Sequence, residues 1–214
     1  MLEVRRLCAG YGRARVLFDV DLAMAAGDVV ALVGRNGAGK STLLKSVMGL
    51  VPPSSGEVRF DGRRIDGREP YEIARLGLGY VPEDRRIFTE LTVAENLAVG
   101  RQAPRPPAPA WSDERLFALF PALAAMRGRP GGRMSGGEQQ MLCIARTLAG
   151  NPRAILLDEP SEGLAPVLVE QVAQAVLELK RAGVAVLLAE QNARFTGRVA
   201  DRSYRLEKGR IIPS

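Results

Sequence analysis

The chain has 214 residues, of which 46% are hydrophobic and 25% charged, and its formal net charge is +6. This length and balance are typical of one globular domain with its own core. No apolar run approaches the roughly 20 residues of a membrane-spanning helix, and the start of the chain lacks the apolar stretch of a signal peptide. We therefore expect a protein that stays in the cytoplasm, although it can dock on a membrane-spanning partner.

The composition also limits the chemistry. The sequence has no histidine, which removes the commonest proton shuttle and metal ligand. Cys8 and Cys143 lie in apolar-patterned segments, so we expect buried, reduced thiols rather than a redox or metal site. The arginines are scattered and few aromatic residues lie among them, so we expect no nucleic-acid partner and read the positive charge as solvated surface.

Strands and helices are expected to alternate in the first part of the chain. Val29–Val33 is an all-apolar run that leads into a glycine-rich loop, as a buried parallel strand does. Helical spacing of apolar residues predicts a helix over 41–50, which the prolines at 52 and 53 would end. Residues 56–62 alternate like an exposed strand before a turn, and Leu78–Val81 is another candidate for a buried strand.

The same alternation returns near the end of the chain. Apolar runs predict buried strands over 154–157 and 184–188, and residues 166–179 have the pattern of an amphipathic helix. Alternating strands and helices are typical of an α/β fold with a largely parallel central sheet.

The middle of the chain has a different pattern. Residues 92–149 are helical in pattern except for a proline-rich run at 104–109, which can form neither a helix nor an inner strand. We expect that run to be an extended surface linker. A single domain over 1–214 is therefore predicted, with an α/β core of residues 1–83 and 150–214 and a helical insertion of residues 84–149.

A glycine-rich loop carries the strongest functional signal. The segment that ends in Gly39, Lys40 and Ser41 matches G-x-x-x-x-G-K-[ST] in full, between a predicted strand and a predicted helix. Backbone N–H groups of such a loop approach phosphate oxygens, Lys40 would neutralise the β- and γ-phosphates, and Ser41 would offer its hydroxyl to Mg²⁺. The predicted nucleotide-binding residues are Gly34, Arg35, Asn36, Gly37, Ala38, Gly39, Lys40, Ser41 and Thr42.

Two carboxylates follow the predicted strand over 154–157. Asp158 would lie at the carboxyl end of the strand, where open α/β sheets bind ligands, and would hold Mg²⁺ through water. Glu159 would polarise the attacking water, as a catalytic residue together with Lys40. A solvated acidic turn is the alternative, and the intact phosphate loop disfavours it.

A second glycine segment, Ser135-Gly136-Gly137-Glu138, precedes a predicted helix. Ser135 and Glu138 have the spacing of a capping box, with Ser135 as the N-cap. The glycines between them are poor helix formers, so we expect that stability alone does not call for them. They would expose backbone N–H groups at the start of the helix, which predicts a second contact with phosphate.

These motifs together resemble the nucleotide-binding domain of the ATP-binding-cassette (ABC) family over essentially the whole chain. The resemblance implies a P-loop NTPase core with an N-terminal antiparallel β region and an inserted helical subdomain. It implies that Ser135 and Gly137 contact ATP held by the opposite subunit, and that residues 161–166 report the state of that subunit. It also implies that Tyr11 stacks on adenine, with an ordinary tyrosine at a strand-edge turn as the alternative.

Two positions depart from the pattern of the family. Glu83 stands where a glutamine usually senses Mg²⁺, and its carboxylate can still bind a hard cation. Gln191 stands where most members have a catalytic histidine, and its amide can donate and accept but cannot become cationic. Both departures leave ATP binding intact and concern the strength of hydrolysis at this subunit's own site.

Four segments, at 82–88, 134–141, 161–166 and 190–192, resemble the LivF-type ATPase of branched-chain amino-acid importers. Within them, Asp84 and Glu162 stand where glycine and leucine would be expected. The chain also ends soon after residue 212, earlier than the resemblance leads us to expect, so a short C-terminal helix would be missing.

This resemblance implies ATP and Mg²⁺ as cofactors and a place on the inner face of the cell membrane. The implied partners are a paralogous ATPase subunit or a second copy of the chain, permease subunits that contact the groove near 83–88, and indirectly an extracytoplasmic binding protein. An importer for urea or another amide or amino acid is the main alternative. A soluble ABC ATPase without transport and a regulator without turnover are further alternatives.

Overall fold

The computed structural model describes residues 1–106 and 110–212. Residues 107–109 of the predicted linker lie outside the described residues. The strands are β1 (Leu2–Tyr11), β2 (Ala14–Met24), β3 (Val29–Val33), β4 (Pro53–Phe60), β5 (Arg63–Arg64), β6 (Leu78–Val81), β7 (Ala154–Asp158), β8 (Ala185–Glu190), β9 (Arg202–Glu207) and β10 (Arg210–Ile212). The helices are α1 (Lys40–Val47), α2 (Pro70–Arg75), α3 (Val93–Gly100), α4 (Asp113–Leu119), α5 (Pro121–Ala124), α6 (Gly136–Ala149), α7 (Pro166–Arg181) and α8 (Ala193–Val199), with a 3-10 turn at Gly131–Arg133.

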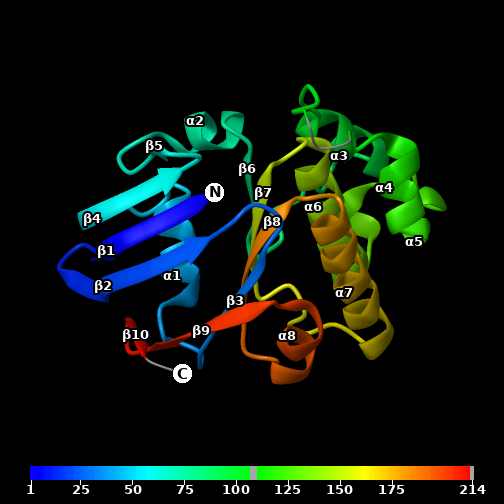
Figure 1. Cartoon of the computed structure of the whole chain (residues 1–214). Coiled ribbons are helices and arrows are strands. Elements are labelled where there is room, and N and C mark those ends of the chain that lie inside the picture. The colour runs from blue at the N-terminus through cyan, green and yellow to red at the C-terminus, as the bar shows by residue number, and fades with distance from the viewer. Residues whose placement is uncertain (107–109, 213–214) are drawn as a thin grey trace.

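The strands form two sheets (Figure 1). The larger has the order β10-β9-β3-β8-β7-β6, and every neighbouring pair from β9 to β6 is parallel. The smaller has the order β2-β1-β4-β5, and all of its pairs are antiparallel. The predicted α/β fold with a largely parallel central sheet and an N-terminal antiparallel region is confirmed.

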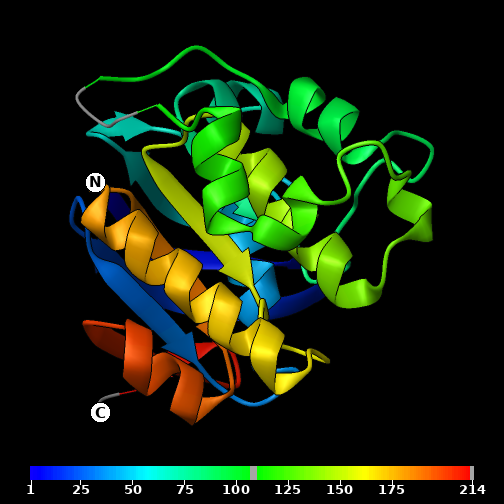
Figure 2. The same cartoon turned by 90° about the vertical axis from the view of Figure 1, so that its right-hand side faces the viewer.

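The central sheet is buried on both faces, which explains its all-apolar strands. In β7, Ala154 and Leu156 face one apolar core, while Ile155 and Leu157 face the other. The first core lies between the two sheets and includes α1; the second lies under α6, α7 and the shorter helices α3 to α5. Figures 1 and 2 show these helices together on the face of the central sheet opposite α1.

Several local predictions can be compared with the structure. The strands predicted at 29–33, 78–81, 154–157 and 184–188 correspond to β3, β6, β7 and β8, with ends that differ by at most two residues. Cys8 and Cys143 are both buried and free, as predicted. The described part of residues 84–149 contains helices α3 to α6 and no strand, while its division from the core stays a prediction. Among residues 1–106 and 110–212, no helix is long and apolar enough to span a bilayer.

The predicted end of the first helix was wrong. Helix α1 ends at Val47, before the prolines, and Gly49 follows it with a φ of 73°. A glycine in the left-handed region just after a helix is a common stop signal, because other residues are strained there. The second proline of the pair, Pro53, begins β4 instead.

A buried asparagine holds the loop that leads from β6 into α3. The side chain of Asn96 is fully buried, and its Oδ1 accepts a hydrogen bond from the N–H of Phe88 at 3.0 Å. Its Nδ2 donates to the carbonyl oxygens of Phe88, Leu91 and Thr92 at 3.0 to 3.1 Å. One side chain thus satisfies several backbone groups and fixes the loop.

We expect Asn96→Leu to destabilise the protein by roughly 2–3 kcal/mol, because it keeps the volume but removes the acceptor of the Phe88 N–H and the buried amide that bridges three backbone carbonyl oxygens. Urea unfolding followed by circular dichroism measures the change. Gln174→Leu is the matched control, since Gln174 is exposed and makes its hydrogen bond to Glu170 at the surface. Equal destabilisation by the two changes would contradict this account.

Candidate functional site

The candidate site lies where three parallel strands end side by side. Val33 of β3 is in register with Glu190 of β8, and Ala189 of β8 is in register with Asp158 of β7. The glycine loop leaves β3 at this edge, so the loop and both acidic strand ends meet there (Figure 1). Ligands bind at this edge in open α/β sheets.

The glycine loop turns directly into α1. Gly39 is the N-cap of α1, with a φ of 109° and no hydrogen bond from a capping side chain. The first N–H groups of α1 therefore keep their capacity for an anion. Ala38 and Thr42 are buried on either side of this turn.

A cavity of 950 Å³ opens beside the loop. This volume is at the upper end of the range for ligand pockets. Gln191, from the loop after β8, lines the same cavity, so two predicted site segments that are distant in sequence share it. The described residues that line it are Val33, Gly34, Arg35, Asn36, Gly37, Ala38, Gln191, Arg205, Leu206, Glu207 and Lys208.

The ammonium group of Lys40 is buried and fully engaged. Its Nζ donates to the carbonyl oxygens of Gly34 at 2.8 Å and Arg35 at 3.2 Å. It also forms an ion pair with Oε1 of Glu159 at 2.8 Å, with 5% and 4% of the two side chains exposed. Two predicted catalytic residues therefore contact each other directly.

Ser41 and Asp158 form the predicted metal-binding pair. The hydroxyl of Ser41 donates to Oδ1 of Asp158 at 2.8 Å, and the hydroxyl of Tyr80 donates to Oδ2 at 3.1 Å. Burial raises the pKa of Asp158, and both hydroxyls oppose that shift. Burial and the charge of Asp158 raise the pKa of Tyr80, which keeps it a proton donor. Glu83 is exposed, and its charge also raises the pKa of Asp158, so it lies within electrostatic reach.

These oxygen atoms fit Mg²⁺, which prefers hard ligands and usually takes only one or two carboxylates besides substrate phosphates. A hydroxyl and a carboxylate oxygen lie together at the end of the glycine loop. Within the described ranges, no group of three or more His, Cys, Asp or Glu side chains forms a complete metal cage. The arrangement therefore suits a cation that arrives with a phosphorylated ligand.

Glu159 has the environment of a general base. It has a φ of 48°, and burial raises its pKa to about 7, while Lys40 opposes the shift and Glu190 adds to it. Its second oxygen, Oε2, is buried and has no hydrogen-bond partner in the described structure. A carboxylate with a pKa near neutrality and a spare acceptor atom can take a proton from water.

Glu190 is a site residue that the sequence analysis missed. It is buried, and its Oε2 accepts hydrogen bonds from the hydroxyl of Ser161 at 2.7 Å and from its N–H at 3.3 Å. Its Oε1 accepts from the N–H groups of Gln191 and Asn192 at 2.9 and 3.1 Å. The carboxylate ties the loop after β7 to the loop that carries Gln191. The sequence contained a signal for Glu190, because an acidic residue at the carboxyl end of a predicted buried parallel strand lies at the edge where such sheets bind ligands.

The second glycine segment begins α6 with the predicted capping box. Oγ of Ser135 accepts from the N–H of Glu138 at 3.3 Å, and Oε2 of Glu138 accepts from the N–H of Ser135 at 2.7 Å. A Cβ atom at Gly137 would lie 2.1 Å from Cδ1 of Leu168. A side chain at position 137 would therefore have to displace the end of the Leu168 side chain of α7, and the prediction that stability alone does not call for the glycines stays a prediction.

Several predicted residues are not among the described residues that line the cavity beside the glycine loop. Of these, Lys40, Ser41, Asp158 and Glu159 are connected to the loop by the contacts described above. Tyr11 ends β1 and is 51% exposed, and Ser135 and Gly137 lie at the start of α6. The structure therefore brings together the glycine loop, Asp158, Glu159 and Gln191, and the roles of all these residues stay predictions.

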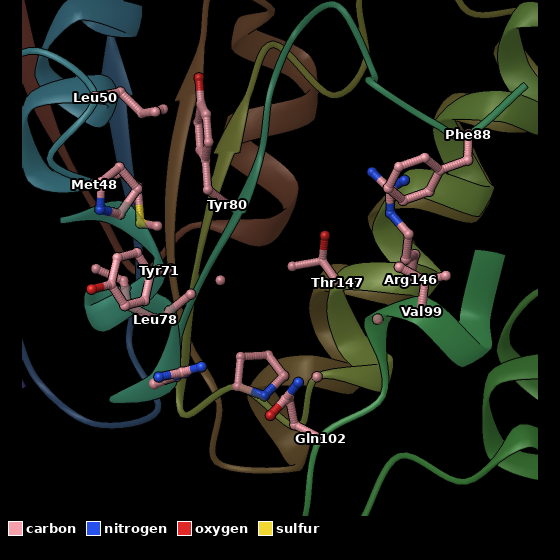
Figure 3. A pocket seen from close by; sticks show the side chains of 17 residues that line it. Met48, Leu50, Tyr71, Leu78, Tyr80, Phe88, Val99, Gln102, Arg146 and Thr147 are labelled. Carbon is pink, nitrogen blue, oxygen red and sulfur yellow. The ribbon is translucent and has the colours of Figure 1, made fainter.

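A second hollow, which we call the apolar groove, lies between α2 and the helices α3 and α6 (Figure 3). It has a volume of 530 Å³ and is lined by exposed apolar side chains of Leu50, Tyr71, Phe88 and Val99. Four of the six exposed large hydrophobic residues in the described chain thus gather here, which is typical of a docking surface. The lining residues are Met48, Leu50, Pro70, Tyr71, Ala74, Arg75, Leu78, Gly79, Tyr80, Phe88, Val99, Gly100, Gln102, Arg146, Thr147, Gly150 and Pro152.

Comparison with known proteins gives a consistent result. Residues 17–162 match a family model described as ABC transporter. The chain is 42% identical to the high-affinity branched-chain amino acid transport ATP-binding protein BraG of Pseudomonas aeruginosa, over 99% of this chain and 91% of the relative. It is 36% identical to the lipopolysaccharide export system ATP-binding protein LptB of Acidithiobacillus ferridurans, over 99% and 88%. It is also 36% identical to a probable branched-chain amino acid transport ATP-binding protein, LivF of Archaeoglobus fulgidus, over 99% and 90%.

Solved structures with the same fold are also similar to the chain. A nucleotide-free ATP-binding cassette from an ABC transporter superimposes with a TM-score of 0.86 at 29% identity, covering 100% of this chain and 90% of the other. The ADP conformation of an ATP-binding cassette superimposes with a TM-score of 0.84 at 30% identity, covering 99% and 89%.

We expect Glu159→Gln to lower the melting temperature of the nucleotide-free protein and to increase the stabilisation that ATP produces. The change leaves the buried ammonium of Lys40 without its counter-charge, which is destabilising until phosphates replace it. Thermal unfolding with and without ATP measures both effects. Glu162→Gln is the matched control, because Glu162 is exposed in the adjoining loop. A melting temperature of Glu159→Gln equal to that of the control would contradict the importance of the ion pair.

Proposed function

The chain belongs to the ABC transporter family and is an ATPase of such a transporter, and on this premise we propose that it energises an importer of branched-chain amino acids. The observation that carries the proposal is its 42% identity to BraG over nearly the whole of both chains. The similarity to LivF supports the same cargo at 36% identity. Lipopolysaccharide export is the second candidate, because LptB is also 36% identical.

In the proposed reaction, the glycine loop binds the phosphates of ATP. Nucleotide binding draws Lys40 from Glu159 toward the β- and γ-phosphates and frees the carboxylate of Glu159 to accept a proton from the attacking water. Ser41 and Asp158, with Glu83 nearby, are the residues that would hold Mg²⁺, and the ion would supply positive charge to the phosphates. Tyr11 stacks on the adenine ring.

We assign the second phosphate contact to a dimer of ATPase subunits. Ser135 is exposed at the start of α6, so this end of the helix is accessible to a second subunit, which supports a contact in trans. The start of α6 then faces ATP bound to the other subunit, whether this is a paralogue or a second copy of the chain. Gln191 completes the cavity of its own subunit.

The apolar groove is the proposed contact with the permease subunits. Arg75 lies over the ring of Tyr71 at 5.3 Å, and Arg146 lies over Phe88 at 5.0 Å, so a cation accompanies an aromatic ring on each wall. A permease segment with apolar residues and an acidic side chain matches these walls. Such docking would hold the subunit on the cytoplasmic face of the cell membrane.

Loss of ATP binding should abolish import of the cargo in living cells. We expect Lys40→Ala, placed in the chromosome of the source cell, to remove uptake of radiolabelled leucine, isoleucine and valine, while leaving urea uptake and lipopolysaccharide export unchanged. Arg63→Ala, at an exposed position of β5, is the control. Normal uptake of all three amino acids in the Lys40→Ala strain would contradict the proposed cargo, and a defect in urea uptake or lipopolysaccharide export would favour that alternative.

The two ATP sites of the transporter should also be unequal where the partner ATPase has histidine at the position of Gln191. Because an amide cannot become cationic, the site on this chain is expected to turn over more slowly. Gln191→Ala should therefore cost less of the total ATPase rate than alanine at the matching partner position, measured in the assembled complex. Equal losses would contradict the asymmetry.

A further inference from the structure

Tyr80 contacts both the candidate metal site and the apolar groove. Its hydroxyl donates to Oδ2 of Asp158 at 3.1 Å, and its ring lines the groove. In Figure 3 the ring stands on β6 between the two walls of the groove, and its hydroxyl points away from the groove, past Leu50. A single half-buried side chain therefore spans the distance between the two sites.

We propose that Tyr80 is a positioning residue that fixes the metal-binding carboxylate of Asp158 and couples it to the occupant of the groove. This rests on the proposed function, which makes Asp158 a ligand of Mg²⁺ and the groove the contact with the permease. Tyr80 has no proposed contact with the nucleotide or the metal; it acts on the metal through its hydrogen bond to Asp158.

The hydrogen bonds of Asp158 explain why the position of the Tyr80 hydroxyl matters for metal binding. Ser41 occupies Oδ1 at 2.8 Å and Tyr80 occupies Oδ2, so the two hydroxyls together set the rotation of the carboxylate. A carboxylate oxygen can accept more than one hydrogen bond or metal contact, so Oδ1 remains available beside the hydroxyl of Ser41. Partners that orient a metal ligand in this way typically change metal affinity by about 10–100-fold when removed.

The strand geometry explains why the groove can influence this bond. Strand β6 is the edge of the central sheet, and Tyr80 is in register with Leu156, two residues before Asp158 on the neighbouring strand. The ring of Tyr80 therefore lies along the sheet toward the end of β7. An occupant that packs on the ring moves or locks the hydroxyl at its far end, and by linkage a bound metal favours one position of the ring.

Tyr80→Phe tests the positioning step, because it keeps the ring and removes only the hydroxyl. Tyr204→Phe is the matched control, since Tyr204 is a half-buried tyrosine of β9 that does not line the groove and whose hydroxyl donates to the carbonyl oxygen of Ala23 at 3.4 Å. Binding to the isolated chain is measured for Mn²⁺ with ATP by electron paramagnetic resonance, and for ATP alone in chelator by fluorescence. We expect Tyr80→Phe to weaken Mn²⁺ binding about 10-fold, leaving metal-free ATP binding unchanged, and Tyr204→Phe to change neither.

Two outcomes of this measurement would overturn the positioning role. One is equal Mn²⁺ affinity of Tyr80→Phe and wild type. The other is an equal loss of affinity for metal-bound and metal-free ATP, which indicates a merely structural residue. The Mn²⁺-binding measurement does not depend on which substrate the transporter carries. The amino-acid uptake experiment therefore tests the transport proposal independently of the positioning role of Tyr80.

The coupling step is tested in the assembled transporter. We expect Mn²⁺ affinity of the wild-type subunit to change several-fold on assembly with the permease, and we expect Tyr80→Phe to remove most of that change. Tyr204→Phe should retain it. An identical change on assembly in wild type and Tyr80→Phe would overturn the coupling.

Discussion

The parallel register of β3, β8 and β7 is the constraint on which the site depends. It brings the ends of three strands to one edge, so that the glycine loop, Asp158 and Glu190 meet although they lie far apart in sequence. The register is held by side chains that alternate between two apolar cores, one on each face of the sheet. A slip of one residue would turn every one of these side chains to the wrong core and separate the catalytic groups.

The carboxylates at this edge hold neighbouring side chains and loops in place, in addition to the chemical roles predicted for them. Glu159 holds Lys40, Asp158 holds Ser41 and Tyr80, and Glu190 holds the loops that carry Ser161 and Gln191. Each carboxylate is buried beside at least one donor, although Oε2 of Glu159 has no partner in the described structure. The site is therefore preorganised by pairs of charged and polar groups.

Features that depend only on residues close together in the sequence were predictable from local sequence patterns. The glycine loop, the strand ending at Asp158 and the capping box at Ser135 each follow from a few consecutive positions. Contacts across long separations were not predictable in this way. Tyr80 reaches Asp158 over 78 positions, and Gly137 lies close to Leu168 of a different helix. The end of α1 was missed because the prolines were a more conspicuous stop signal than Gly49.

The ion pair between Lys40 and Glu159 has a consequence for the choice of anion. Before nucleotide binds, the positive charge of the loop is already neutralised from within the protein, and both groups are buried. An anion with one phosphate has little to offer in exchange for a buried carboxylate. A nucleotide with several phosphate groups brings more negative charge and more contacts, so it compensates more of the interaction that Lys40 loses when it leaves Glu159. The ion pair thus favours anions with several phosphate groups over single phosphate ions.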